Sequence, residues 1–270
     1  MSTAICCMSM QPEHFEFWIF HHLEIVGFDY ILLRIENTIL EIPEPYKTRI
    51  FICENVYIQD GHIDSIPRQQ ERQMNFVNGC LQEICSFHNI QYLLHIDDDE
   101  LIVLHYDFKG ISQLLSKYLP FTNLRFQNYE AVLRGTPRNT EYFFQTTWFK
   151  NGSLEECRSY RNGKSLTNVK KQTRSNGSHT FTGEWIKVSE EDAIILHYDS
   201  ISFEKWKKKF LHLKTMTKIP KGIFPFYQDS IKLFLNNPQE NVLYEFWQKE
   251  ITKCKNPINV CENYNLVLIN

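Results

Sequence analysis

The sequence feature that most constrains this chain is an acidic cluster at the end of an apolar run. Tyr92–Ile96 is mostly apolar, four carboxylates follow in Asp97–Glu100, and the chain is apolar again from Leu101. If the apolar run is a buried strand, the acids stand at its carboxyl end, where open α/β sheets bind their ligands. Side chains alternate along an extended chain, so Asp97 and Asp99 point the same way and can reach one cation.

Neighbouring carboxylates repel one another unless a positive charge neutralises them. A divalent cation is the strongest such partner, and ligands that are all oxygen suit Mg²⁺ or Mn²⁺. The pattern therefore predicts a metal site that includes Asp97 and Asp99. The alternative explanation is a solvated acidic turn between two strands.

The segments before the cluster predict a β-α-β arrangement. Thr3–Met10 and Phe28–Ile35 have the composition of buried strands. Between them, His14–Val26 has apolar residues at helical spacing, and Gly27 is placed to end that helix. A long helix over Arg68–His88 then leads into the strand that carries the acids. Strands joined this way run parallel, so their carboxyl ends share one edge of the sheet.

The second half of the chain is less regular. We expect strands at Leu124–Leu133 and Ala193–Tyr198, and a polar, basic and partly mobile segment at Asn162–Ser178 between them. The remaining predicted elements are three helices and a terminal strand: Ser202–Leu213, Gln228–Leu235, Gln239–Ile251 and Tyr264–Ile269. With no repeat or linker, the whole predicts one α/β domain over residues 1–270, built on a mostly parallel central sheet flanked by helices.

Composition limits the classes of partner. A net charge of -3 gives no general attraction for nucleic acid or an anionic membrane. The eight cysteines form no CxxC pair, which argues against structural zinc and favours a reduced intracellular protein. No signal peptide is expected, and no run approaches the roughly 18 apolar residues of a transmembrane helix. The prediction is a cytoplasmic protein.

Three residues outside the cluster are candidates for the same site. His197 ends a late apolar strand and could add a nitrogen ligand, Arg72 starts the helix before the acidic strand, and Lys164 lies in the basic segment. Each also has a plain explanation, which is a satisfied core histidine, a solvated helix arginine or a solvated lysine. Neither GxGxxG nor a P-loop is present, so a phosphate-bearing ligand would be held through a metal.

The order of these motifs resembles a known family. Asp97-x-Asp99-Glu100 is similar to the DxD motif of GT-A glycosyltransferases. More of the chain looks like glycosyltransferase family 92 and related family 2-like enzymes, and the similar stretches keep the family order over about residues 4–210. They are Glu13…Glu16-Phe-Trp18…His22…Gly27…Tyr30…Glu36-Asn37, Leu94–Glu100, and Lys164-Ser165…His179…His197-Tyr198 followed by Phe203–Trp206. Two departures are Pro12, where the family has Asn, and Glu36, where it has Asp.

This resemblance implies a GT-A, Rossmann-like fold and transfer of a sugar from a nucleotide-diphosphate donor. A UDP-sugar would be the donor, Mn²⁺ or Mg²⁺ the cofactor, and a glycan or glycoprotein the acceptor. Residues 1–104 would form the nucleotide-sugar and metal half, and residues 105–270 the acceptor half. By analogy, Asp99, His197 and Asp97 would hold the metal, and these residues would bind the nucleotide sugar: Ser9, Met10, Glu36, Arg72, Asp97, Asp98 and Lys164.

The family group is usually inverting, which requires a carboxylate base for the acceptor hydroxyl. Glu184 and Glu130 are the two candidates by their order in the chain, and each could instead be a surface glutamate. Two other classes of function stay open. The same carboxylates could serve a metal-dependent phosphohydrolase or nuclease, and the chain could be a non-catalytic sugar-binding module.

Overall fold

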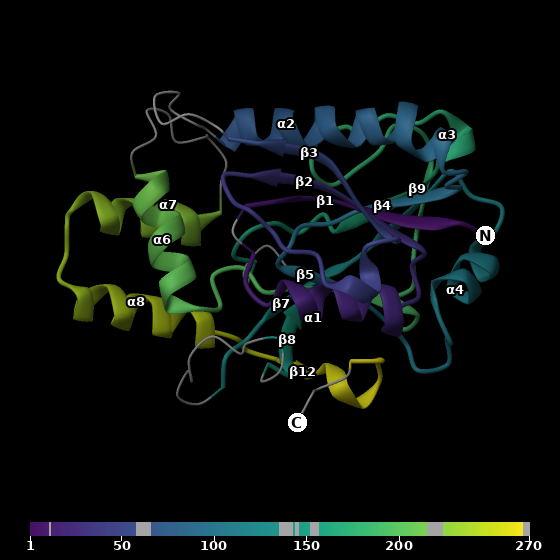
Figure 1. The fold of residues 1–270 in the computed structure, drawn as a ribbon. Helices are drawn as coiled ribbons and strands as arrows, with labels where there is room; N and C mark the ends of the chain where they lie inside the picture. The colour runs from purple at the N-terminus through teal and green to yellow at the C-terminus, as the bar shows by residue number, and fades with distance from the viewer. Residues whose placement is uncertain are drawn as a thin grey trace.

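The described residues of the protein form two β-sheets and the helices around them (Figure 1). The computed structural model describes residues 1–10, 12–57, 66–134, 143, 146–151, 157–214 and 224–266. The first sheet has seven strands in the order β10-β6-β9-β4-β1-β2-β3, and the second has five in the order β12-β8-β7-β11-β5. The predicted fold class, α/β with a central sheet flanked by helices, is confirmed.

The strands of the first sheet are β1 (Thr3–Ser9), β2 (Tyr30–Glu36), β3 (Ile50–Val56), β4 (Tyr92–His95), β6 (Asn123–Phe126), β9 (Lys164–Asn168) and β10 (Trp185–Lys187). Strands β3, β2, β1 and β4 are parallel neighbours, and β6 and β10 also pair in parallel. Only β9, between β4 and β6, runs antiparallel to both of its neighbours. The carboxyl ends of the other six strands therefore point toward one edge, which we call the acidic edge because Asp97–Asp99 follow β4 there.

The second sheet is mixed. Its strands are β5 (Glu100–Leu104), β7 (Asn128–Ala131), β8 (Trp148–Asn151), β11 (Ala193–His197) and β12 (Ile258–Asn259). Leu124–Leu133, predicted as one strand, is two strands in different sheets, because the chain leaves the first sheet after Phe126 and enters the second at Asn128. The predicted strand at Tyr264–Ile269 extends beyond the described residues, and Tyr264 forms an isolated bridge with His105.

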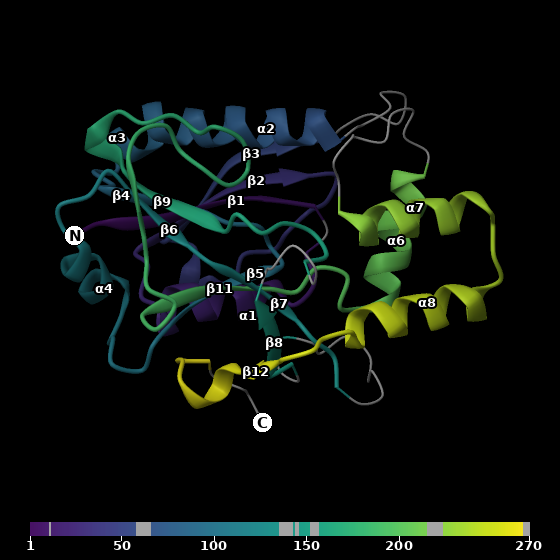
Figure 2. The same ribbon diagram turned by 180° about the vertical axis from the view of Figure 1, so that it is seen from behind.

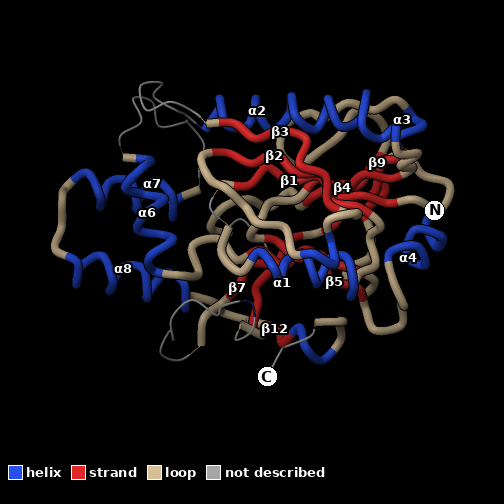
Figure 3. The backbone as a smooth tube through the Cα atoms, in the orientation of Figure 1, coloured by secondary structure: helices blue, strands red, loops and turns tan. Residues whose placement is uncertain are grey.

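Helices cover both faces of the first sheet (Figure 3). They are α1 (Phe15–Phe20), which continues as the π-helical turn η1 (His21–Ile25); α2 (Ile66–Gly79), which continues through the π-helical η3 (Cys80–Ile84) into α3 (Cys85–Phe87); and α4 (Ile111–Tyr118). Three short 3-10 turns are η2 (Glu44–Tyr46), η4 (Val169–Lys171) and η5 (Val260–Glu262). The helices predicted at His14–Val26 and Arg68–His88 are thus confirmed, and Gly27, at φ 80°, follows the first.

Alternating side chains on β1 divide the core into two clusters. Ile5 and Cys7 face the larger cluster, which both sheets, α1 and α4 share. Ala4, Cys6 and Met8 face a smaller cluster beneath α2 and α3. This period-two division is expected of a strand buried on both faces.

The last three helices pack mainly on one another. They are α6 (Phe203–Leu213), α7 (Pro225–Leu235) and α8 (Glu240–Thr252), and they form a separate aromatic cluster around Trp206, Phe210 and Trp247. Ser202 caps α6 as predicted, because its hydroxyl accepts a hydrogen bond from the Lys205 amide. Figure 1 shows this three-helix group to one side of the two sheets.

The prediction of a partly mobile basic segment at Asn162–Ser178 is wrong for its first part. Lys164–Asn168 forms β9, which is almost entirely buried between β4 and β6 (Figure 2). Its polar side chains have buried partners, as in the hydrogen bond of 2.6 Å between the hydroxyls of Thr167 and Thr173. A strand whose polar side chains find hydrogen-bond partners in the folded structure has the composition of a loop.

Candidate active site at the acidic edge

Strand register brings the ends of β1 and β4 together. Cys6 pairs with His95, so Ser9 and Asp98, three residues farther along each strand, are level with each other. The Ser9 hydroxyl donates a hydrogen bond of 2.7 Å to Asp98 Oδ2. Met10 follows at the same edge and is 41% exposed. These three predicted nucleotide-side residues are therefore neighbours.

Lys164 is an ammonium group buried among carboxylates. Its side chain is fully buried, and Nζ lies 2.5 Å from Asp97 Oδ2 and 3.2 Å from Glu100 Oε2. Burial alone would lower the pKa of Lys164, but these two carboxylates raise it well above its usual range. Burial alone would likewise raise the pKa of Asp97, and the Lys164 charge holds it well below its usual range. Both groups are charged at neutral pH, and the plain explanation of Lys164 as a solvated lysine is wrong.

Glu100 fixes the turn that carries the aspartates. Its Oε2 accepts a hydrogen bond of 2.8 Å from the Asp97 amide, and its Oε1 accepts the hydroxyl of Tyr160. Gln73, on α2, donates a hydrogen bond of 2.9 Å to the other oxygen of Asp97. Sequence reasoning missed Gln73 and Tyr160 because nothing in a local pattern marks a contact across such distances in the chain.

Asp99 points to a different set of partners from Asp97. Asp99 Oδ1 lies 3.8 Å from His197 Nε2, and its Oδ2 lies 3.7 Å from Lys205 Nζ. The backbone also joins the two segments, because the Tyr198 amide donates to the Asp99 carbonyl at 2.9 Å. Residues nearly one hundred positions apart are thus held face to face, as predicted for Asp99 and His197.

The environment of His197 is strongly negative. Burial alone would lower its pKa, but the carboxylates of Glu130, Asp99, Glu100 and Asp199 raise it to about 9. Its Nδ1 lies 3.9 Å from Glu130 Oε1 and makes no hydrogen bond with the described residues. A cation between Asp99 and the imidazole would replace the proton on His197, as metal binding does elsewhere.

The side chains at the acidic edge suit a cation that is coordinated partly by the protein and partly by a bound ligand. The described residues contain no group of three His, Cys, Asp or Glu side chains placed to hold a metal ion. Asp99 and His197 supply two possible ligands, and the carboxylate of Asp97 already contacts Lys164 and Gln73. Mg²⁺ commonly uses one or two carboxylates together with substrate phosphates and water. Asp99 and His197 therefore fit a metal whose coordination a diphosphate completes.

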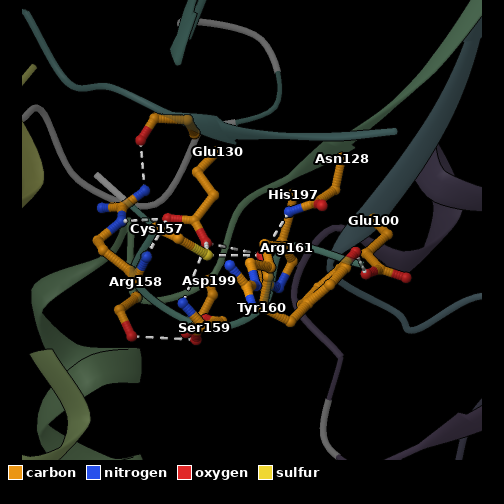
Figure 4. Close-up of polar contacts among 12 residues, drawn as sticks. Glu100, Asn128, Glu130, Cys157, Arg158, Ser159, Tyr160, Arg161, His197 and Asp199 are labelled. Atoms are coloured by element: carbon orange, nitrogen blue, oxygen red, sulfur yellow. Dashed lines mark hydrogen bonds and ion pairs between the residues drawn. The ribbon is translucent and has the colours of Figure 1, made fainter. Parts of the chain in front are cut away.

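Glu130 holds a neighbouring loop (Figure 4). Its carboxylate accepts hydrogen bonds from the amides of Arg158 (2.7 Å) and Ser159 (3.0 Å), from Cys157 Sγ, and from the Arg158 guanidinium. Burial alone would raise its pKa, but His197 and Arg158 lower it to about 2. A carboxylate that is buried, saturated and this acidic is a poor base for an acceptor hydroxyl.

Glu184 lies away from the acidic edge. The residue after it, Trp185, pairs with Asn123, which pairs with Thr167, and Thr167 pairs with Leu93 near the start of β4. Three strand spacings and several residues along the strands place Glu184 on the order of 20 Å from the aspartates. Its side chain is exposed. Glu130 is occupied by hydrogen bonds and Glu184 lies far from Asp99. Neither candidate is therefore well placed to take a proton from an acceptor hydroxyl.

The buried Glu36 and the partly buried Arg72 form an ion pair at the end of β2. The Arg72 guanidinium donates to both oxygens of Glu36, at 2.9 and 3.0 Å, and Arg34 Nε donates to the same carboxylate at 2.8 Å. Arg72 precedes Gln73 on α2, so this helix carries contacts to the ends of both β2 and β4. Arg72 is thus not a merely solvated helix arginine.

A second charge cluster, centred on the buried Asp199, lies just beyond His197. Asp199 accepts hydrogen bonds from Lys209 Nζ (2.6 Å), Tyr227 (3.0 Å) and the hydroxyl of Ser159. It joins the end of β11 to α6 and α7 and to the loop held by Glu130. No local sequence pattern identified it, since an Asp after a strand is usually part of a turn.

Two of the solved structures that match this chain are distant from it. The crystal structure of S. aureus TarS is 10% identical, with a TM-score of 0.41; the match covers 87% of this chain and 43% of the TarS chain. A CMP:2-keto-3-deoxy-manno-octonic acid synthetase complexed with CTP is 8% identical, with a TM-score of 0.28, and the match covers 63% of this chain and 75% of that one. Likenesses of this size establish no function.

No curated protein matches the sequence. None of the described helices has the length and apolar character needed to span a membrane. A family model does match: residues 56–233, about two thirds of the 270-residue chain, fit glycosyltransferase family 92, and this stretch contains Asp97–Asp99, Lys164 and His197. The chain belongs to glycosyltransferase family 92.

Proposed function

We propose that this chain transfers a sugar from a nucleotide-diphosphate sugar, with a UDP-sugar as donor, to a hydroxyl group of a glycan or glycoprotein. Family membership supports the reaction class. The observation that carries the proposal is the facing pair of Asp99 and His197, 3.8 Å apart, beside the charged Asp97–Lys164 pair. This is a strand-end site with paired acids, a histidine and cations, as a diphosphate and its metal require.

The chain's residues divide into two groups in this reaction. Ser9, Met10 and Glu36, at the ends of β1 and β2, border the nucleoside, and Arg72 holds Glu36 in place. Asp97 lies toward the ribose and phosphates, fixed by Lys164 and Gln73. Ser9, Glu36 and Asp97 are each held by a partly buried hydrogen bond before any ligand binds, which reduces the cost of ordering the site.

Asp99 and His197 would hold Mn²⁺ or Mg²⁺ together with the diphosphate oxygens. When bound, such an ion stabilises the negative charge that develops on the departing diphosphate. Lys205, 3.7 Å from Asp99, adds a positive charge on the same side. Removal of the metal with EDTA is expected to abolish most of the activity, and Mn²⁺ is expected to restore it.

The proposed displacement is inverting and occurs in one step. The acceptor oxygen forms a bond to the anomeric carbon as the bond from that carbon to the diphosphate breaks, and the diphosphate leaves with the electron pair. The hydroxyl proton passes to a base. An NMR spectrum of the first product formed tests the stereochemistry: inversion of the anomeric centre is expected, and retention would contradict it.

Calorimetric titration of UDP and GDP, with and without Mn²⁺, tests the donor site. UDP is expected to bind at least tenfold more tightly with Mn²⁺, and Asp99→Asn to lose at least tenfold of that affinity. Asp229→Asn is the matched control, because Asp229 is a half-exposed carboxylate on α7 whose ion pair is local. If neither nucleotide binds, or Asp99→Asn binds as well as the control, the proposal is wrong.

A further inference from the structure

A basic pocket opens beside the site. It has a volume of about 280 Å³ and is lined by Arg125, Phe126, Gln127, Arg161, Asn162, Trp185 and Lys187. Three of these residues are cationic and none is acidic, although the whole chain has more acidic than basic residues, with 32 against 29. The pocket therefore offers a local positive charge that the composition of the chain does not suggest.

The two arginines have no carboxylate partner among the described residues. Arg125 Nε donates to the Asn162 carbonyl at 2.7 Å, and its guanidinium lies 4.9 Å from the centre of the Trp185 ring. Arg161 is exposed. Lys187 differs, because its ammonium pairs with Glu190 at 2.7 Å. Two guanidinium groups next to an open volume suit an anion, which they can bind through paired hydrogen bonds.

Trp185 supplies a different kind of contact. It is 54% exposed, which is unusual for so large an apolar side chain, and it lines the same pocket as the two arginines. A flat indole surface next to polar donors suits a ligand with an apolar face and polar substituents. A sugar ring that carries an acidic group has both features.

The pocket is connected to the acidic edge by one short segment. Tyr160 donates to Glu100, with its ring 4.9 Å from that of His197, and Lys164 binds Asp97. Arg161 and Asn162, which lie between them in the chain, line the pocket; Figure 4 labels Tyr160 and Arg161 beside His197.

Strand pairing places the pocket at the same edge of the sheet. Phe126 pairs with Lys164 and Arg125 pairs with Lys187, so the pocket lies near the carboxyl ends of β6 and β10. These are two and three strands from β4, so the pocket is about 10 to 15 Å from the aspartates. A ligand that extends from the transfer site past one or two sugar rings would reach it.

We propose that this pocket is an acceptor subsite for an acidic sugar, one bearing a carboxylate, sulfate or phosphate group. Arg125 and Arg161 bind the anionic group, and Trp185 lies against the ring. This inference rests on the proposed function, since it assumes that the acidic edge binds the donor. It adds the class of acceptor: an oligosaccharide with an acidic residue a short distance from the hydroxyl that is glycosylated.

Tryptophan fluorescence tests the subsite directly, in the full chain with UDP and Mn²⁺ present. The probes are tetrasaccharides of galacturonic acid, of sulfated heparin and of neutral cellulose, with tripolyphosphate as a generic polyanion. At least one acidic tetrasaccharide is expected to change the emission of Trp185 and to bind at least tenfold more tightly than the neutral one. Trp185→Phe is expected to remove most of that signal, because Trp18, Trp206 and Trp247 are buried and Trp148, which is partly exposed on β8 of the second sheet, does not line the pocket.

The variants separate the subsite from general electrostatics. Arg125→Gln/Arg161→Gln is expected to lose at least tenfold in affinity for the acidic tetrasaccharide and to bind UDP as the wild type does. Lys232→Gln is the matched control, since Lys232 is 67% exposed on α7. The inference would be overturned if the double variant bound the acidic tetrasaccharide as the wild type does. It would also be overturned if the charged and neutral tetrasaccharides bound equally or not at all, or if tripolyphosphate bound more tightly than the acidic tetrasaccharides.

The two proposals fail differently. Loss of the subsite with intact UDP binding would leave the donor site standing. Loss of UDP binding in the wild type would contradict the proposed function itself.

Discussion

At the scale of single residues, Lys164 decides the charge of the site. A fully buried ammonium is stable only with partners, and Asp97 and Glu100 provide two carboxylates within 3.2 Å of it. The position of this lysine depends in turn on Gly163, which immediately precedes it. Gly163 has φ 65°, and a Cβ built there would lie 1.8 Å from the Phe126 carbonyl oxygen. Only glycine fits this approach of one strand to the next.

Gly163→Ala is therefore expected to destabilise the protein by more than about 2 kcal/mol, because the added methyl group forces β9 away from β6. The measurement is urea unfolding followed by circular dichroism. Gly177→Ala is the control: it also has a positive φ, at 92°, but nothing lies within 4 Å of its Cβ. It is expected to cost about 1 kcal/mol. Equal losses in the two variants would show that the contact with Phe126 does not matter.

The sequence predicted Asp97, Asp99 and His197 as site residues, because strand ends and acid spacing are local patterns. It did not identify the partner of each group. Order in the chain makes Glu184 a candidate base and Glu130 its competitor, yet Glu130 is buried against Arg158 and Glu184 is exposed before β10, three strands from β4. Only the register of several strands separates them, and register depends on packing that no single segment encodes.

At the scale of elements, α1 and η1 complete the free edge of the second sheet. The indole of Trp18 donates to the Glu100 carbonyl at 2.8 Å, and His21 Nε2 lies 2.8 Å from the Ile102 carbonyl. Both carbonyls belong to β5, the edge strand, so side chains of the helix replace a neighbouring strand. The helical spacing of apolar residues predicted this helix. It did not predict the π-helical turn at His21–Ile25, which changes the spacing locally.

Acid is expected to weaken this element. Burial lowers the pKa of His21 from 6.5 to about 4, so the unfolded chain binds a proton at a higher pH than the folded one does. The contribution of neutral His21 to the free energy of unfolding is complete above pH 6.5. It decreases by about 3 kcal/mol as the pH falls toward 4. His21→Gln keeps a donor without this titration. Its free energy of unfolding, measured in urea between pH 7 and 4, is expected to fall less steeply than that of the wild type. Parallel curves would contradict this account.

At the scale of the whole molecule, both sheets contribute to one site. Asp97 follows β4 in the first sheet, and His197 ends β11 in the second. The predicted division at residue 104 does not coincide with a sheet boundary, since β6, β9 and β10 all belong to the first sheet. The assignment of residues 1–104 to the donor and of residues 105–270 to the acceptor stays a prediction. The overall α/β class followed from the sequence, but the crossing of the chain between sheets did not.

Contacts at Asp199 and Ser200 join the three-helix group of α6, α7 and α8 to the two sheets. Asp199 binds Lys209 and Tyr227, and the Trp247 indole donates to the Ser200 carbonyl at 2.7 Å. Asp199→Asn would leave the partly buried Lys209 without its carboxylate, at an expected cost of about 2 kcal/mol. Hydrogen exchange should show that the variant exchanges faster than the wild type in α6 and α7, and that the increase is smaller in β1 and β2. Uniform protection in the variant would mean that this carboxylate does not hold the helices.

The central claim is that the acidic edge activates a nucleotide sugar for transfer. The most direct measurement is nucleotide release from a panel of UDP- and GDP-sugars with Mn²⁺, for the wild type, Asp99→Asn and Asp229→Asn. We expect that one UDP-sugar is turned over, that Asp99→Asn lowers the rate at least a hundredfold, and that Asp229→Asn leaves it unchanged. Release that is absent from the whole panel, or equal in all three proteins, would contradict this claim.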